Sequence, residues 1–433
     1  MPFTLPENGK RRVVIVGAGF AGLGIAKDLA GVPGIQVVLL DRHNYHTFQP
    51  LLYQVATAGL QPDSIAYPLR RIFRGKTNVH VRLAQVHSVD AEARLLHTDQ
   101  GPLPYHDLVI ATGSRPRFFG AFASIPNQLM TLKTLPGALD LRSTINQQFE
   151  KALERPDLEW RMKCLSIGIV GGGPTGVELA GALAEMRRFV LPKDYPDMDF
   201  SLMHIVLYEA SPSLLGAMSA NASEKARVYL HQLGVDLRLG VPVENYENGF
   251  LMGADGSTLH TDTVIWTAGV EGAPLDGLVP EHLGPGNRIQ VDAHHQAIGV
   301  EHVFALGDVA LMRTERFPNG HPMLAPVAQQ QAQNLAANLI RSMKNVAPKP
   351  FRYKDKGSMA TIGRNKAVVD LPGFQMQGAL AWFIWMFVHV YSLIGFKNRL
   401  VALLDWSFSY FTYDRSLSLI IRPFRKPEPA APK

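Results

Sequence analysis

The chain has 433 residues, of which 46% are hydrophobic and 18% are charged, and its formal net charge is +6 at pH 7. This length and composition fit two or three folded domains and exclude a largely disordered protein. The single cysteine, Cys164, excludes an internal disulfide relay and a cysteine-held iron–sulfur set, and we expect it to be a small buried hydrophobic residue. The fifteen histidines show no metal-ligand spacing, so we expect no metal site.

The first predicted unit is a strand, a turn and a helix over 13–29, with the sequence VVIVGAGFAGLGIAKDL. Gly17, Gly19 and Gly22 have the G-x-G-x-x-G spacing that lets a dinucleotide diphosphate approach the start of a helix. The next apolar run ends at Asp41, nineteen residues after Gly22, where a carboxylate would meet the adenosine ribose hydroxyls. This pairing favours dinucleotide binding over a purely structural glycine turn.

A second unit of the same kind, LSIGIVGGGPTGVELAGAL, covers 165–183. Its glycines have the same spacing: Gly171, Gly173 and Gly176. The following strand ends at Glu209, farther along than the usual ~20 residues, so we expect an insertion near 192–200. Ala210 and Ser211, rather than an arginine, follow Glu209, and this predicts NADH over NADPH because a carboxylate accepts from a free 2′-hydroxyl and repels a 2′-phosphate.

Two later strands, at 107–114 and 262–270, match each other and end in small residues that let a cofactor lie against the strand ends. Two ordinary strand exits are the alternative. A further strand at 301–310 and a helix from Ala325 complete the first unit, so the second unit is inserted into it. We predict an α/β fold with two Rossmann-like dinucleotide-binding domains, the first at 1–124 and 286–345, the second at 125–285, and C-terminal amphipathic helices at 346–433.

The C-terminal part is apolar and basic. The nineteen residues over 378–396 contain no Asp, Glu, Lys or Arg. This length is barely sufficient for a membrane-spanning helix, and the six aromatic residues of the segment suit a membrane interface. The next segment has a polar stripe of Asp405, Ser409, Thr412 and Ser416 and an apolar stripe of Leu400, Leu404, Phe408 and Phe411. The flanking basic residues are Lys397, Arg399, Arg415, Arg422, Arg425 and Lys426.

From Lys349 onward, thirteen Lys and Arg against five Asp and Glu give a net charge of +8. Beside apolar helices this charge favours an anionic membrane surface over nucleic acid. We expect a monotopic anchor in the membrane interface; a spanning helix and a homodimer interface are the alternatives. Because the charged ENGKRR leads directly into the first strand, we also expect no signal peptide and a first domain that folds in the cytoplasm.

The sequence resembles the type II NADH dehydrogenases, the single-subunit NADH:quinone oxidoreductases, over nearly its whole length. The resemblance rests on the first glycine motif, YHTFQPLLYQVATAGLQPDSIAYPLR, the paired ATG and TAG, GPTGVEL, ALGDVA, APVAQQQ, KGSMATIGRNKAVVD and WFIWMFVHVYSLIGFKNRL. The first motifs occur in many flavoproteins with two dinucleotides, whereas the C-terminal block is far more specific.

The resemblance implies a respiratory-chain flavoprotein at the cytoplasmic face of the inner membrane, which passes electrons from NADH through FAD to a membrane quinone without pumping protons. The expected FAD residues are Gly17, Gly19, Phe20, Ala21, Gly22, Asp41, Arg42, Val86, Ala111, Thr112, Gly113, Asp308 and Ala328. The expected NADH residues are Gly171, Gly173, Pro174, Thr175, Gly176, Glu178, Glu209, Ala268 and Gly269.

The resemblance gives particular roles to three residues. Asp308 matches an aspartate that binds the flavin ribityl chain, with helix-turn capping as the alternative. Glu178 matches a catalytic glutamate beside the nicotinamide and flavin, although a first-turn carboxylate is also favoured by the helix dipole. Gln330 matches the second glutamine of an A-Q-x-A-x-Q quinone-site motif. Pro326 replaces the first glutamine of that motif, and a proline at this position still suits the start of a helix. We assign Gln329, Gln331 and Gln333 to solvent.

Two rival functions remain open from the sequence. One is an NADH-dependent flavoprotein reductase of a small soluble redox protein, with the apolar C-terminus buried in a dimer. The other is a redox-sensing binding protein that holds FAD and NADH without turnover.

Overall fold

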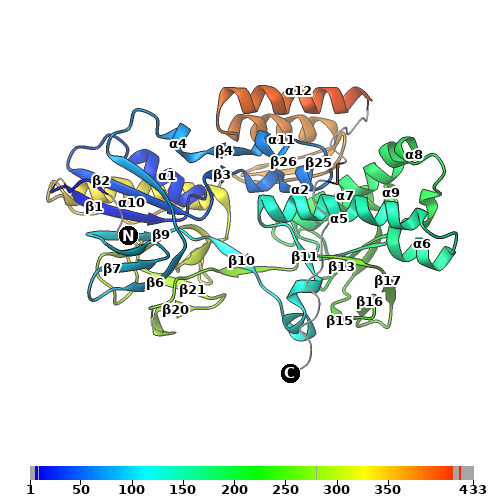
Figure 1. Ribbon diagram of the computed structural model, residues 1–433, viewed down its shortest axis with the longest axis horizontal. Coiled ribbons are helices and arrows are strands. Elements are labelled where there is room, and N and C mark those ends of the chain that lie inside the picture. The colour runs from blue at the N-terminus through cyan, green and yellow to red at the C-terminus, as the bar shows by residue number, and fades with distance from the viewer. Residues whose placement is uncertain (1–4, 8, 279, 413–418, 421–433) are drawn as a thin grey trace. The chain divides into compact units, whose positions relative to one another are not determined.

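The computed structural model describes residues 5–7, 9–278, 280–412 and 419–420. The chain forms two compact units (Figure 1). Unit 1 comprises residues 1–46, 67–115 and 270–355, and unit 2 comprises residues 47–66, 116–269 and 356–433.

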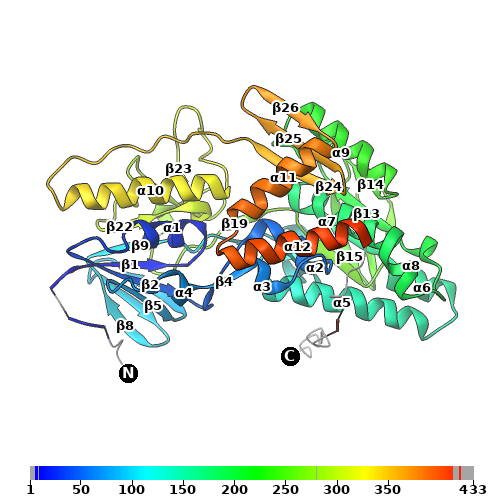
Figure 2. The same cartoon turned by 90° about the horizontal axis from the view of Figure 1, so that it is seen from above.

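Unit 1 is built on a five-stranded parallel sheet. Its strand order is β22 (Val303–Ala305), β9 (Asp107–Ile110), β1 (Arg11–Val16), β2 (Ile35–Asp41) and β5 (Val79–Leu83). Helices α1 (Phe20–Asp28) and α10 (Ala325–Ser342) pack together beside this sheet, as Figure 2 shows. The central strands β1, β2 and β9 are mainly apolar because layers on both faces bury them, whereas the edge strand β5 includes His80 and Arg82.

The second layer of unit 1 is an antiparallel sheet. It consists of β6 (Val86–Asp90), β7 (Leu95–Thr98) and β8 (Gly101–Pro104). Its apolar side chains form one core with those of the parallel sheet. The remaining elements of the unit are α4 (Leu69–Ile72), β20 (Leu283–Gly284), β21 (Arg288–Val291) and β23 (Ala310–Met312).

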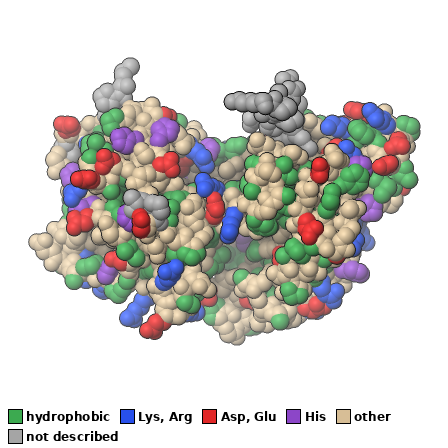
Figure 3. Space-filling view, turned by 90° about the horizontal axis from the view of Figure 1, so that it is seen from below, with side chains coloured by type: hydrophobic (Ala, Val, Ile, Leu, Met, Phe, Trp, Pro, Cys, Tyr) green, Lys and Arg blue, Asp and Glu red, His purple; other side chains and the backbone are tan. Residues whose placement is uncertain are grey.

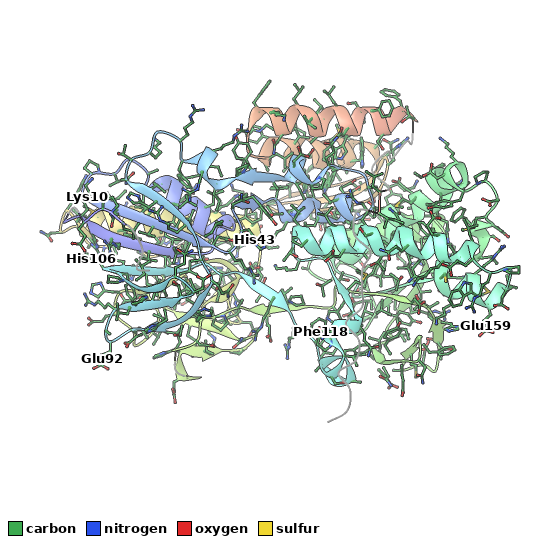
Figure 4. The ribbon with its side chains drawn as sticks, viewed as in Figure 1. Lys10, His43, Glu92, His106, Phe118 and Glu159 are labelled. Atoms are coloured by element: carbon green, nitrogen blue, oxygen red, sulfur yellow. The ribbon has the colours of Figure 1, made fainter. Side chains whose placement is uncertain are left out.

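Unit 2 repeats this plan. The parallel sheet has the order β11 (Met130–Thr131), β18 (Thr263–Trp266), β12 (Ile167–Val170), β13 (Ile205–Glu209) and β14 (Asp236–Leu239). An antiparallel sheet of β15 (Val243–Glu247), β16 (Phe250–Gly253) and β17 (Thr258–His260) precedes β18, just as β6 to β8 precede β9. The ring of Phe118, labelled in Figure 4, lies 5.7 Å from that of Trp266 and packs against the core between these two sheets.

The helices of unit 2 lie on the side of the parallel sheet opposite the antiparallel sheet (Figure 1). They are α5 (Leu135–Leu153), α6 (Leu158–Leu165), α7 (Pro174–Glu185), α8 (Leu191–Asp194) and α9 (Ala220–Gln232), with α2 (Leu52–Ala56) and α3 (Pro62–Ile65) from the segment that follows β3 (Tyr45–Thr47). A π-helical turn at Met186–Val190 and α8 occupy the longer connection between α7 and β13, where the sequence predicts an insertion. Four short strands, β3, β4 (Ala66–Pro68), β10 (Ser114–Pro116) and β19 (Val270–Gly272), lie where the chain passes between the units.

The α/β fold with two Rossmann-like halves, the second inserted into the first, is confirmed, and some elements differ in detail. The strand predicted at 301–310 is divided into β22, a helical turn at Gly307–Val309 and β23. Gly307 has φ +73°, a left-handed conformation that ends the strand.

The C-terminal segment contains a sheet as well as the predicted helices. Strands β24 (Ser358–Gly363), β25 (Lys366–Leu371) and β26 (Phe374–Gln377) form an antiparallel sheet whose turns use Asn365 and Gly373 in left-handed conformations. The backbone of β24 lies directly on α7, because a Cβ built on Gly181 would collide with the carbonyl of Ile362. Residues 356–433 belong to the compact unit 2 and residues 346–355 to unit 1. This division differs from the predicted separate segment at 346–433.

Two helices complete unit 2. Helix α11 (Ala379–Ser392) and helix α12 (Phe396–Thr412) run side by side in Figures 1 and 2, and Gly395 with φ +87° separates them. The 14 residues of α11 reach roughly 21 Å, short of the ~30 Å hydrocarbon core of a bilayer. Within the described ranges, none of the helices combines the length and apolar character that a membrane crossing requires.

Candidate functional site

The glycine turn of unit 1 brings the ends of three elements together. Gly17 follows β1 with φ +98°, and a Cβ on it would collide with the backbone of Ala111 after β9. Gly22 in α1 lies so close to Gly17 that a Cβ would overlap the Gly17 carbonyl oxygen. Only glycine allows this approach of helix and strand, which directs the N-terminus of α1 at the turn.

Asp41, at the end of β2, is bonded to this turn. Its Oδ2 accepts from the Ala18 amide at 2.7 Å and its Oδ1 from the His43 amide at 2.7 Å. His43 is labelled in Figure 4. Buried His46 supports the turn from behind, with Nδ1 donating to the Ala18 carbonyl at 2.8 Å, and burial lowers its pKa. In dinucleotide-binding folds of this type, a carboxylate at the end of the second strand binds the adenosine ribose.

The N-terminus of α10 and the ALGDVA turn meet α1. A Cβ on Gly307 would lie 3.3 Å from Ala21 Cβ and 3.4 Å from Ala328 Cβ, so small residues bring the three elements together. The Gly307 amide donates to Gln331 Oε1 at 2.7 Å, and Gln331 is buried. Our assignment of Gln331 to solvent is therefore wrong. The three- and four-residue spacing of Ala328, Gln331 and Leu335 places it on the buried stripe of α10, which the sequence already contains.

The other residues expected at the FAD site also lie in unit 1. Asp308 accepts from Ser114 Oγ at 2.5 Å, and Thr112 Oγ1 donates to the Ala273 carbonyl at 2.6 Å. Gly113, with φ +73°, follows Thr112 and accepts from the Ala273 amide through its carbonyl. The remaining positions are Phe20 at the start of α1, exposed Arg42 after β2, and buried Val86 at the start of β6.

The glycine turn of unit 2 has the same construction. Gly171 has φ +110° and presses on the backbone of Ala268 after β18, with 2.7 Å from a built Cβ to the Ala268 nitrogen. A Cβ on Gly176 would overlap the Gly171 carbonyl oxygen, as for Gly22 and Gly17. Pro174 and Thr175 open α7 and are exposed, and Gly269 follows Ala268 with φ +145°.

Glu209 is the counterpart of Asp41. Its Oε2 accepts from the Gly172 amide at 2.6 Å and its Oε1 from the Ser211 amide at 2.7 Å. In both units the carboxylate therefore binds the amide after the first glycine and the amide two residues beyond itself. The longer separation of Glu209 from its glycine turn does not alter this arrangement, because the intervening residues form the turns around α8.

Glu178 is buried in α7 under the C-terminal sheet. Its Oε1 accepts from the Thr361 amide of β24 at 3.5 Å. Burial raises the pKa of Glu178 to about 8, although the Thr361 amide and the Trp385 indole of α11 favour the charged form. Glu178 lies in the second turn of α7, and the first turn has no acidic residue, so the helix dipole does not account for this carboxyl. A carboxyl in this environment is protonated at neutral pH.

Gln330 has both polar atoms bonded to one backbone unit. Its Nε2 donates to the Lys354 carbonyl at 3.0 Å and its Oε1 accepts from the Lys354 amide at 3.0 Å. One and two turns along the same face, Asn334 and Asn338 bond Lys349, so α10 holds the segment 349–354 at both ends. Helix α10 begins at Ala325 with Pro326 in its first turn, as the sequence predicts.

Comparison with known proteins agrees with this geometry. Residues 11–332 match the pyridine nucleotide-disulphide oxidoreductase family and residues 356–413 match the NDH2 C-terminal domain. The chain is 34% identical to the type II NADH:quinone oxidoreductase Ndh of Mycobacterium tuberculosis, over 94% of this chain and 89% of that protein. The chain belongs to the type II NADH:quinone oxidoreductase family.

Two further relatives extend the comparison. A type II NADH:quinone oxidoreductase of Haemophilus influenzae is 28% identical over 91% of this chain and 97% of that protein. The fold is similar to that of NDH2 from Plasmodium falciparum in complex with NADH, with a TM-score of 0.85, 20% identity and coverage of 94% and 99% of the two chains. The likeness of fold to this solved structure thus extends over nearly the whole chain.

Both glycine turns are open at the start of the helix that follows them, as expected of a type II NADH:quinone oxidoreductase. Gly19 and Gly173 precede α1 and α7 without a side-chain cap, and neither helix has an acidic residue in its first turn. A Cβ built on either glycine would meet no atom within 4 Å. An uncapped helix N-terminus with open space before it suits a diphosphate, so the residues fit FAD in unit 1 and NADH in unit 2.

This member of the family has no thiol relay. Cys164 is buried before β12, and burial raises the pKa of its thiol to about 11, so it is a small hydrophobic residue as predicted. In the part of the chain that the structure describes, no three His, Cys, Asp or Glu side chains are grouped as a metal ion would need.

Proposed function

We propose that this chain transfers two electrons from NADH, through bound FAD, to a membrane quinone. The observation that carries the proposal is the duplicated carboxylate and glycine turn, one copy in each unit, together with a C-terminal segment of the NDH2 type. FAD supplies the ability to take a hydride from NADH and to pass two electrons to a quinone. The chain supplies the two dinucleotide sites, and Glu209 favours NADH over NADPH.

The experiment that tests this function compares electron acceptors. Purified protein is expected to oxidise NADH with a short-chain quinone over many turnovers, and NADPH at least tenfold less efficiently. A small iron–sulfur protein is the acceptor that the rival reductase function requires. Turnover with that protein but not with any quinone would contradict the proposal, and absence of turnover with both would favour a redox sensor.

For Glu178 we propose the role of a proton donor. A carboxyl that burial keeps protonated at neutral pH can release a proton when negative charge develops nearby, as in the reduction of a quinone. β24 and Trp385 lie against this buried carboxyl. No chain of charged residues across a membrane accompanies it in the sequence, so the proposed activity does not pump protons.

We propose that Gln330 acts on the quinone step through the segment that it holds. Gln330→Ala removes both bonds to Lys354 and is expected to slow transfer from reduced flavin to quinone about tenfold, while anaerobic flavin reduction by NADH stays nearly unchanged. The neighbouring exposed Gln329 provides the control, and Gln329→Ala should change neither step. Rapid-mixing absorbance measures both half-reactions, and equal loss of both in Gln330→Ala would contradict this role.

The exposed apolar face of α11 and α12 is proposed to lie in a membrane interface. Its most exposed members are Leu380, Phe387, Tyr391, Phe396, Leu404, Phe408 and Phe411, all at least 58% exposed. On the inner side, Ala381, Trp385, Ala402 and Trp406 are buried, so the two helices present an apolar surface outward as well as inward. By contrast, the face in Figure 3 carries acidic and basic side chains interspersed.

Basic side chains accompany this face. Lys397 is exposed and Arg399 lies over the Tyr391 ring at 5.2 Å, near the start of α12. Ser416, Arg415, Arg422, Arg425 and Lys426 lie outside the described residues. We therefore propose an anionic lipid surface as the partner, with the protein on the membrane face that meets the NADH-containing compartment, which we expect to be the cytoplasm.

Replacing Phe387, Leu404 and Phe408 together by serine is expected to lower binding to anionic phospholipid vesicles at least tenfold, because each apolar side chain loses roughly 1.5–3 kcal/mol of burial. NADH oxidation with a water-soluble quinone should be retained. The matched control is Leu158→Ser on α6, an apolar residue that is 57% exposed elsewhere in unit 2. Vesicle co-sedimentation measures the binding. Unchanged binding combined with conversion of a dimer to a monomer would instead identify the face as a homodimer interface.

A further inference from the structure

The loop 210–218 of unit 2 connects Glu209 to α9 and is held closely to the glycine turn. At its start the Ser211 amide donates to Glu209 Oε1 at 2.7 Å, and in its middle the Leu215 amide donates to the Gly172 carbonyl at 2.9 Å. Leu214 lies against Gly172, where a built Cβ would be 2.6 Å from Leu214 Cδ2. This loop therefore borders the adenosine end of the proposed NADH site.

The loop contains a strained residue. Leu215 has φ +52°, a left-handed conformation that is unfavourable for a non-glycine residue. Leu214 and Leu215 are buried while Ser211 and Gly216 are exposed. Such a conformation persists only when the surrounding structure fixes it, so the loop depends on its anchors.

The anchor at the far end of the loop comes from the C-terminal sheet. Asp370 of β25 accepts from the Ser219 amide through Oδ2 at 2.7 Å and from Ser219 Oγ through Oδ1 at 3.0 Å. Ser219 is also the N-cap of α9, with Oγ accepting from the Ala222 amide at 3.2 Å. The carboxylate thus binds both groups of the capping residue at the positive end of a helix.

The backbone of Asp370 is held on both sides by neighbouring strands. Strand β25 is the central strand of its sheet, with Asp370 paired to Ser358 of β24 and Gln375 of β26. The same strand packs against α9 and α11. The position of Ser219, and through it the exit of the loop, is therefore set by a segment about 150 residues farther along the chain.

We propose that Asp370 is a positioning residue for NADH: by fixing Ser219 it holds the loop 210–218 in the conformation that receives the adenosine half of the nucleotide. The proposal rests on the proposed function only in that NADH is the nucleotide of unit 2. It makes the C-terminal sheet part of the support of the NADH site, beside its place over Glu178.

The test compares Asp370→Ala with a matched control. Asp199→Ala removes another aspartate that accepts from a serine amide at a helical turn in the same unit, Ser201 at 2.9 Å, outside the loop. Calorimetric titration with ADP-ribose should show about tenfold weaker binding to Asp370→Ala, the loss expected for hydrogen bonds to a charged group, and no change for Asp199→Ala. The NADH concentration for half-maximal flavin reduction should rise by the same factor, with the limiting rate and the quinone KM within twofold of normal.

Asp370→Asn guards against misfolding, because asparagine keeps the volume and one acceptor oxygen; it should weaken ADP-ribose binding by a smaller factor. Adding Ser219→Ala to Asp370→Ala should weaken binding by less than the product of the single effects, since both act on one link. Unchanged ADP-ribose affinity in Asp370→Ala, or a parallel loss in limiting rate and quinone KM, would overturn the proposal. The proposed function fails if NADH does not reduce the flavin of the unmodified protein. Binding of ADP-ribose needs no electron transfer, so it tests the role of Asp370 separately.

Discussion

Gly176→Ala is expected to leave the flavin bound and to lower the rate of its reduction by NADH at least a hundredfold. A Cβ at this position would overlap the Gly171 carbonyl oxygen and lie 2.9 Å from Thr267 Oγ1, so α7 has to move away from the glycine turn. The diphosphate of NADH then loses the helix N-terminus that binds it. Flavin absorbance of the purified variant and its anaerobic reduction by NADH measure the two effects.

Gly22→Ala is the matched variant because Gly22 has the same relation to Gly17 in unit 1. It is expected to purify without flavin. The contrast between the two variants distinguishes the nucleotide that stays bound in unit 1 from the nucleotide that is exchanged in unit 2. Normal reduction of the Gly176→Ala flavin, or equal flavin loss in both variants, would contradict the assignment of one dinucleotide to each unit.

Glu178→Gln is expected to slow transfer from reduced flavin to quinone about a hundredfold at pH 7, since glutamine offers no proton. In the unmodified protein the rate of this step should fall as the pH rises through about 8, where Glu178 ionises, and this inflection should disappear in the variant. Stopped-flow absorbance over pH 6 to 9 measures both half-reactions. An inflection near pH 8 that persists in Glu178→Gln would remove Glu178 from the quinone step, and selective loss of the NADH step would indicate nicotinamide positioning instead.

The same substitution has a predicted effect on stability. Burial raises the pKa of Glu178 from 4.5 to about 8, so between these values the folded protein holds a proton that the unfolded chain has released. The stabilising contribution is complete below pH 4.5, is lost as the pH rises toward 8, and is constant beyond that. Glu178→Gln does not lose stability in this way. Its melting temperature relative to that of the unmodified protein should therefore increase from pH 5 to pH 8. The corresponding change in the difference in unfolding free energy has an upper limit of roughly 5 kcal/mol. A difference that does not vary with pH would show that Glu178 is ionised in the folded protein.

The dinucleotide-binding halves could be predicted from local sequence because their geometry depends on local rules. Gly17 and Gly171 need positive φ, Gly22 and Gly176 need the absence of a Cβ, and each strand ends on the carboxylate that binds its own turn. These requirements fix residue types at fixed spacing, so a pattern in the sequence identifies them.

The support of these sites could not be predicted in the same way because it depends on long-range packing. Asp370 binds Ser219 across 151 residues and Thr361 reaches Glu178 across 183, and no local spacing records either contact. The sheet at 358–377 directly precedes the apolar segment 378–396, and the predicted helical region at 346–433 includes it. Gln331 is an intermediate case, since the helical period places it inside while its polar character suggested solvent.

Anaerobic flavin absorbance of the purified protein, during addition of NADH and then of a short-chain quinone, tests the central claim most directly. The proposed function predicts rapid bleaching by NADH and full recovery on quinone. Bleaching without recovery would keep both dinucleotide sites and contradict the quinone as acceptor, and a protein that purifies without flavin would contradict the whole assignment.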